Sequence, residues 1–153
     1  MIERFYVTPE DTYKVGGNNK VLYTPVVVVK TSELAHIFLA GRTARLPNGD
    51  VHPKGDMRGQ IRLVCENIEK ALACVGATFA DVVRTVTYTT DVEEYYRVCD
   101  ERFKFFKEPL PTSTLLGMNK LGMPDMLVEI EVEAMMEAER LTINRAAATS
   151  DGR

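Results

Sequence analysis

The chain has 153 residues, of which 45 % are hydrophobic and 27 % charged, proportions typical of one globular domain. Its 19 Lys and Arg residues against 22 Asp and Glu give a net charge of −3, so it lacks the positive excess that would hold a phosphate backbone. We therefore expect no nucleic-acid partner. The charged first residues are unlike a signal peptide and no run of 18 apolar residues occurs, so we expect a cytoplasmic protein without a membrane partner.

The three cysteines, at positions 65, 74 and 99, indicate a reducing compartment because their number and spacing fit neither a disulfide framework nor a zinc site. The sequence has two histidines, His36 and His52, which excludes a multi-histidine metal centre. His52 lies in a loop-like stretch, where a histidine is more often incidental than catalytic, although imidazole is a suitable acid or base near neutral pH.

Two strands are predicted near the start of the chain. Residues 22–29, LYTPVVVV, are rich in β-branched side chains and predict a strand whose first half, because of Pro25, lies at an edge or a bulge. Residues 35–41, AHIFLAG, predict a second strand that forms a hairpin with the first. The next stretch, residues 43–56, contains two prolines and an Asn-Gly pair and predicts a loop.

Two helices follow from the spacing of apolar residues. Over residues 57–75 these residues recur every three or four positions and form one stripe, with Asp56 as the predicted N-cap and Gly76 just after the helix. A second helix is predicted over residues 92–106, preceded by residues that suit a capping box.

Further strands separate and follow these helices. Residues 82–90, VVRTVTYTT, have the β-branched composition of a strand, and residues 113–118 predict another. In residues 126–134 glutamates alternate with apolar side chains, so one face meets the core. The order strand–strand–helix–strand–helix–strand–strand predicts an α+β fold with two helices on one face of a mixed sheet. We expect a single domain over residues 1–136 and a tail over residues 137–153 that loses strand character.

No third helix is predicted to cover the second face of the sheet, whose side chains mix threonine, glutamate and apolar residues. A half-apolar open face on a small domain meets either water or another subunit. We favour self-association through this face.

Three segments of the chain occur in the order and spacing of a known family. They are LAGR at residues 39–42, the block of residues 55–106 with its segments QIRLVCENI and VVRTVTYTTD, and PTSTLLGMNKLGMPDMLVEIEVEA at residues 111–134. Over roughly residues 20–136 the chain resembles the Rid superfamily (RidA/YjgF-like proteins).

This resemblance implies a chorismate-mutase-like fold in a homotrimer, with the sheets packed into a central barrel and clefts between subunits. In the best-known branch these clefts hydrolyse reactive enamines and imines to ketoacids and ammonia. There an arginine holds the substrate carboxylate and a glutamate positions a water. The glutamate matches Glu129 and an early tyrosine matches Tyr23, whereas Ser113 stands where the arginine does and Cys99 replaces an asparagine of the second helix.

The missing arginine weakens carboxylate binding, because a serine offers one neutral hydrogen bond of about 0.5–1.5 kcal/mol in place of a guanidinium's charge-assisted pair. Arg42 and Arg45 follow the second predicted strand and are candidates for the cation that Ser113 cannot supply; surface charges on a loop are the alternative. Thr114 can orient a ligand through its hydroxyl group, and the backbone near Gly41 is open to close approach.

We therefore expect a homotrimeric Rid-type hydrolase, a deaminase that releases ammonia from an enamine, imine or 2-aminomuconate-like small molecule. Glu129 is the predicted catalytic residue, and the predicted substrate-binding residues are Tyr23, Gly41, Arg42, Cys99, Ser113 and Thr114. No cofactor and no metal are implied. The alternative is a trimer that binds a ligand or protects proteins after losing deaminase activity. Ribonuclease action is disfavoured by the acidic balance of the chain.

Overall fold

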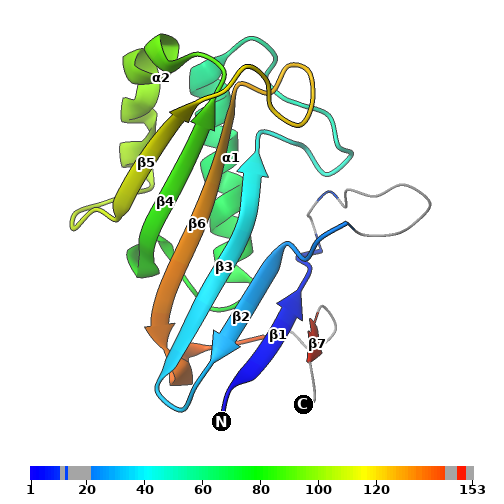
Figure 1. Ribbon diagram of the computed structural model, residues 1–153, viewed down its shortest axis with the longest axis vertical. Helices are drawn as coiled ribbons and strands as arrows, with labels where there is room; N and C mark the ends of the chain where they lie inside the picture. Colours follow the sequence, from blue (N-terminus) through cyan, green and yellow to red (C-terminus); the bar gives the residue numbers. More distant parts are fainter. Residues whose placement is uncertain (11–12, 14–21, 144–147, 151–153) are drawn as a thin grey trace.

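One mixed sheet and one layer of helices make up the fold (Figure 1). The computed structural model describes residues 1–10, 13, 22–143 and 148–150. Within them the strands are β1 (Glu3–Val7), β2 (Val26–Lys30), β3 (Leu34–Thr43), β4 (Val82–Thr89), β5 (Thr112–Gly117), β6 (Val128–Glu137) and β7 (Ala148–Ser150). The α-helices are α1 (Met57–Ala73) and α2 (Val92–Val98), and short 3₁₀ helices cover Phe79–Asp81, Cys99–Lys104 and Ala138–Arg140.

The sheet has the strand order β5-β4-β6-β3-β2-β1-β7, in which β4 and β5 are parallel and the other neighbouring pairs antiparallel. This confirms the predicted α+β class, with both helices on one face of the sheet (Figure 1). The predicted hairpin of β2 and β3 is also confirmed, with Val28 opposite Ile37. Between Leu39 and Arg42 the pairing of β3 with β6 shifts at a β-bulge, which interrupts the alternation of β3 side chains at Gly41.

Helix α1 begins where the sequence predicts, because the Asp56 carboxylate accepts a hydrogen bond from the Gly59 N–H at 2.9 Å. The helix ends at Ala73, and Gly76 after it adopts φ +80°, the left-handed conformation that glycine tolerates best. Its apolar stripe packs on the sheet; fully buried side chains include Ile61, Val64, Ile68 and Leu72 of the helix and Val28, Ile37 and Ile130 of the strands. Each contributes about 1.5–3 kcal/mol to folding.

The second helix is shorter than the one predicted over residues 92–106: α2 ends at Val98, and a 3₁₀ helix continues to Lys104. The tighter winding accompanies the burial of Glu101, which is 1 % exposed and accepts hydrogen bonds from Arg62 Nε at 2.6 Å and Lys104 Nζ at 2.7 Å. These two bonds lower the pKa of Glu101 to about 2. The segment is therefore fixed to α1 by buried charge rather than by an apolar stripe alone.

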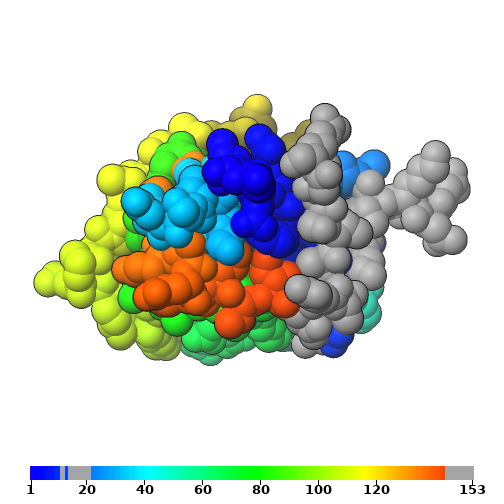
Figure 2. Space-filling view, turned by 90° about the horizontal axis from the view of Figure 1, so that it is seen from below, coloured from blue at the N-terminus to red at the C-terminus, as the bar shows by residue number. Residues whose placement is uncertain are grey.

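Two strands at one end of the sheet, β1 and the edge strand β7, are not expected from the sequence. They pair antiparallel, with Phe5 opposite Ser150, so the prediction that strand character is lost beyond residue 136 is wrong for Ala148–Ser150. A strand of three residues has too little periodicity to be recognised. Residues 144–147 and 151–153 of the predicted tail lie outside the described residues. Figure 2 views the end of the molecule where β1 begins and shows the N-terminal residues beside the segment that follows β6.

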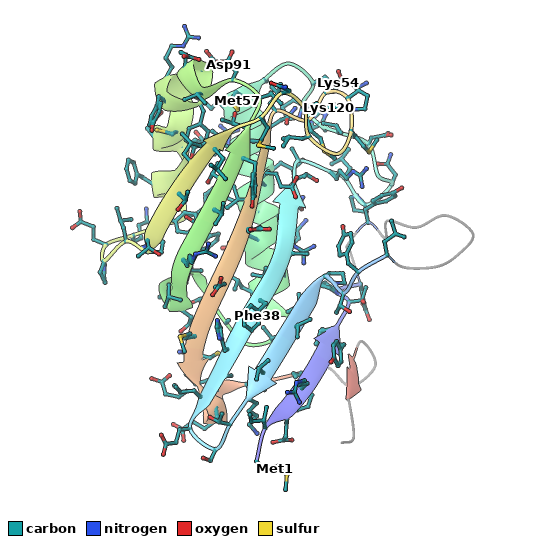
Figure 3. All side chains as sticks on the ribbon, in the orientation of Figure 1. Met1, Phe38, Lys54, Met57, Asp91 and Lys120 are labelled. Carbon is teal, nitrogen blue, oxygen red and sulfur yellow. The ribbon has the colours of Figure 1, made fainter. Side chains whose placement is uncertain are left out.

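The face of the sheet away from the helices is half-apolar, as the sequence predicts. Phe38 (Figure 3) and Met135 lie on this open face with 38 % and 39 % exposure, and Glu133 stands directly across from Phe38. The Glu133 carboxylate binds Arg84 Nη1 at 2.7 Å and lies 3.3 Å from His36 Nε2. In the part of the chain that the structure describes, no helix has the length and apolar character to cross a membrane.

Candidate functional site

Glu129 is half-buried on the open face, at the start of β6. Its neighbours Val128 and Ile130 are fully buried on the helix side, so the strand alternation turns the Glu129 carboxylate the other way. Tyr88 of β4 and Thr43 of β3 stand directly across from it. The pKa of Glu129 is raised above its ordinary value, first by burial and then by the negative charge of Glu131. The carboxylate therefore retains a proton at higher pH than an exposed glutamate does.

Gly41 leaves the space that the Glu129 side chain occupies. A Cβ at position 41 would overlap Glu129 Oε1 and lie 2.9 Å from Glu129 Cδ, closer than a side chain tolerates. The carboxylate thus lies over the bare backbone of the β3 bulge. Two of the residues that the sequence singled out, Gly41 and Glu129, are in this way brought into contact.

Arg45 follows β3 and is close enough to Glu129 for its positive charge to oppose the rise in pKa of that carboxyl. The Asn67 side-chain amide of α1 donates to the carbonyl oxygens of Thr43 at 3.1 Å and Arg45 at 2.9 Å, which fixes the backbone on which the guanidinium is carried. That guanidinium lies 4.4 Å from the centre of the Tyr13 ring.

The donors of the Arg45 guanidinium are incompletely used. Its Nη2 contacts the sulfur of Met123, and its buried Nε has no hydrogen-bond partner among the described residues. A thioether is a weak acceptor, whereas a guanidinium binds carboxylates best with two parallel bonds. Arg45 is therefore equipped to hold an anionic group next to Glu129.

Tyr88 and Glu131 complete this part of the open face. The Tyr88 hydroxyl donates to Glu131 Oε2 at 3.1 Å, and the pKa of Tyr88 is raised by burial and by this bond. Sequence reasoning missed both residues as members of the site. The alternation of glutamates in β6 marks Glu131 as a neighbour of Glu129, but the placement of Tyr88 depends on the register of β4 with β6, which the sequence does not reveal.

Arg42 lies on the other face of the sheet from Glu129. It stands across from Ile130, is 7 % exposed, and donates from Nη2 to the carbonyl oxygen of Pro25 at 3.2 Å. Burial lowers the pKa of Arg42, and a smaller charge interaction with Tyr23 raises it. Tyr23, which precedes β2, is thus close enough to influence the charge of Arg42, while Arg42 itself lies on the opposite face of the sheet from the Glu129 carboxylate.

Of the remaining predicted residues, Ser113 and Thr114 lie at the β5 edge of the sheet and Cys99 lies in the 3₁₀ helix after α2. Ser113 and Thr114 are exposed on edge strand β5, where the register with β4 turns Thr114 toward the open face and Ser113 toward the helix side. Cys99 is half-buried at the start of its 3₁₀ helix, and its thiol donates to the Tyr96 carbonyl at 3.5 Å. Within the described chain, no hydrogen bond joins any of these three residues to Glu129.

His52 lines a groove that borders the Arg45 region. The groove also includes Met123, which contacts Arg45, and the ion pair of Lys54 Nζ with Asp125 Oδ2 at 3.0 Å. Figure 3 shows Lys54 at the end of the molecule where β3 ends, beside the label of Lys120. Among residues 1–10, 13, 22–143 and 148–150, no group of three His, Cys, Asp or Glu side chains is placed to hold a metal ion. Glu129 supplies a carboxylate with a raised pKa, and the positive charge of Arg45 acts on it.

Three comparisons relate the chain to known proteins. Residues 21–136 match the family model described as Endoribonuclease L-PSP. A RutC family protein of Pyrococcus horikoshii is 30 % identical over 101 residues, which cover 66 % of this chain and 79 % of the relative. TdcF of Escherichia coli, named as a reactive intermediate deaminase, is 25 % identical over 105 residues, 67 % of this chain and 80 % of TdcF. A crystal structure from Mycobacterium tuberculosis, described as a member of the YjgF/YER057c/UK114 family, is 30 % identical and has a TM-score of 0.63, covering 81 % of this chain and 97 % of that one.

Proposed function

From the premise that the chain belongs to the Rid (YjgF, endoribonuclease L-PSP) family, we propose that it is a deaminase of small reactive molecules. Its substrate is an enamine, an imine or a 2-aminomuconate-like compound, and its products are a carbonyl compound and ammonia. The name of TdcF, a reactive intermediate deaminase, supports this class of reaction. The chain acts without a metal or organic cofactor, in the cytoplasm.

The observation that supports this proposal most strongly is the half-buried Glu129 carboxylate over Gly41, with a raised pKa. Water adds to the carbon of the protonated C=N bond while Glu129 takes one of its protons, which gives a neutral carbinolamine. Glu129 then returns that proton to the nitrogen, the C–N bond breaks and ammonia leaves, and the carbinolamine hydroxyl gives its proton to solvent water as the carbonyl forms. A base that both accepts and returns a proton works best when its pKa lies near the working pH.

Arg45 is the residue that we assign to the anionic end of the substrate. Arg45 acts on the charge of Glu129, and its buried Nε has no partner among the described residues; the Nε of Arg42 has none there either, but Arg42 lies on the helix side of the sheet. A charge-assisted hydrogen bond to a carboxylate contributes about 1.5–3 kcal/mol, which offsets the loss of the arginine that Ser113 replaces in the family pattern.

The proposal includes a homotrimer that buries the open face. The half-apolar surface around Phe38 and Met135 supports it, because such a face on a small domain is suited to contact with another subunit. Ser113 and Thr114 lie on edge strand β5, two strands away from the β6 strand that carries Glu129, and Cys99 begins the 3₁₀ helix after α2. In a trimer we assign them to the cleft that is completed by a neighbouring subunit.

The test is ammonia release from freshly generated 2-imino acids and from 2-aminomuconate, measured above spontaneous hydrolysis. Glu129→Gln should lose at least about 100-fold of the acceleration, because general acid–base catalysis contributes that much or more. Glu133→Gln, on the same strand and face, is the matched control and should retain it; light scattering checks that both variants assemble alike. No acceleration by the unmodified chain with either substrate contradicts the proposal and favours a trimer that binds a ligand or protects proteins.

A further inference from the structure

A second carboxylate stands beside Glu129 and has no part in the proton transfers proposed above. Glu131 follows two residues along β6 and faces the same side of the sheet. Directly across from Glu131 is Val86, so its hydrogen bond comes diagonally, from the Tyr88 hydroxyl at 3.1 Å. One tyrosine therefore stands opposite the first glutamate and binds the second.

We propose that Tyr88 and Glu131 are positioning residues for Glu129: the Tyr88 hydroxyl holds the Glu131 carboxylate in place, and the fixed negative charge makes Glu129 a stronger base. The effect on Glu129 itself does not depend on turnover. Its consequence for catalysis rests on the proposed function, because a stronger base takes a proton from water more readily.

The groups around Glu129 can be named element by element. Glu131 faces it from β6 and Tyr88 from β4, while Gly41 and Thr43 of β3 carry no charge. Arg45, just after β3, is the opposing cation. Burial raises the pKa of Glu129, Glu131 raises it further and Arg45 lowers it. Replacing Glu131 therefore leaves the effects of burial and of Arg45 on the pKa of Glu129 in place and removes only the effect of the Glu131 charge.

The size of the effect of Glu131 on the protonation midpoint of Glu129 follows from strand geometry. Side chains two residues apart on one face of a strand lie about 7 Å apart. At that separation, and even with water-like screening, two negative charges shift a protonation midpoint by about half a pH unit. Partial burial of both carboxylates reduces the screening and enlarges the shift.

The experiment is a titration of the Glu129 side chain in protein labelled with carbon-13 at the glutamate carboxyls. The Glu129 resonance is assigned as the one missing from Glu129→Gln. In Glu131→Gln its midpoint should fall by at least about half a pH unit, since a like charge has been removed. Tyr88→Phe, which releases Glu131 without changing a charge on β6, should give a smaller fall. Glu133→Gln is the matched control and should leave the midpoint unchanged.

A midpoint that does not move in Glu131→Gln overturns the inference, and so does an equal movement in Glu133→Gln. The Tyr88 hydroxyl gives a second readout: its own pKa should fall in Glu131→Gln, because the bond to Glu131 helps to raise it. If these shifts occur in a protein that accelerates no deamination, the positioning role stands and the proposed function fails. If the unmodified protein is active and the shifts are missing, only the positioning role fails.

Discussion

Replacing Gly41 with alanine is the most direct test of the site geometry, because one methyl group would enter the space of the Glu129 carboxylate. The added Cβ would overlap Glu129 Oε1 and lie 2.9 Å from Cδ and 3.0 Å from Cγ, so the side chain has to rotate away. A displacement of about 1 Å of a reacting group costs on the order of 100-fold in rate, equivalent to about 2.7 kcal/mol of transition-state stabilisation.

The fold should tolerate the same change. The atoms in the way belong to the end of a flexible side chain, and Gly41 does not have a positive φ. Loss of backbone freedom in the unfolded chain stabilises an alanine variant by about 0.4–1 kcal/mol, which offsets part of the cost of the rotation. We therefore expect the free energy of unfolding to change by less than about 1 kcal/mol.

Two measurements check the Gly41→Ala variant. The kcat/KM for ammonia release should fall about 100-fold, and the carboxyl midpoint of Glu129 should move down toward that of an exposed glutamate, because burial is the main cause of its raised pKa. Gly122→Ala is the matched control, since a Cβ at that position meets no atom within 4 Å. Wild-type kcat/KM with an unmoved midpoint would refute the reasoning. A loss of several kcal/mol in stability would refute it too, because the backbone and not Glu129 would then absorb the overlap.

Three further substitutions test other contacts. Arg45→Gln should raise KM about tenfold or more with little change in kcat, since it removes a charge-assisted bond to the substrate; steady-state kinetics that show an unchanged KM contradict this role. Gln60→Leu leaves three backbone hydrogen bonds at 2.7–2.9 Å without their buried partner, and urea unfolding should show a loss of about 2–4 kcal/mol. Glu101 has a folded pKa of about 2 against an ordinary 4.5, so its contribution to stability is present above pH 4.5 and lost as the pH falls through 2. In Glu101→Gln the free energy of unfolding should change less with pH between 4.5 and 2. A pH dependence equal to that of the unmodified chain argues against the ion cluster.

The helices and strands with strong local patterns could be predicted from the sequence. Helix α1 has a continuous apolar stripe and a capping aspartate, and β6 alternates glutamates with apolar side chains. The spacing of apolar residues along the sequence is therefore enough to identify both elements. The change from α2 to a 3₁₀ helix could not be predicted, because the 3₁₀ segment is held by a bond between Glu101 and Arg62 of α1, about 40 residues away in the chain. Local spacing contains no information about such a partner.

The candidate site, too, could be predicted only in part from the sequence. Glu129 and Gly41 could be named from the family resemblance, but the choice between Arg42 and Arg45 depends on one irregularity. Strict alternation from Leu39 would turn Arg42 to the open face, and the β-bulge reverses this and places it opposite Ile130. The bulge has no clear signal in the sequence.

The pairing of β1 with β7 brings the two ends of the sheet-forming chain together, so the protein is suited to circular permutation. Phe5 and Ser150 are direct neighbours across the sheet margin, so a short peptide linker can join the two ends, and new ends can be opened at the exposed turn of Thr31–Glu33. Such a circular permutant keeps β3, β4 and β6, and with them the surroundings of Glu129, unbroken. If the permuted chain keeps the proposed deaminase activity, that activity requires the surroundings of Glu129 and not the order of the strands along the polypeptide.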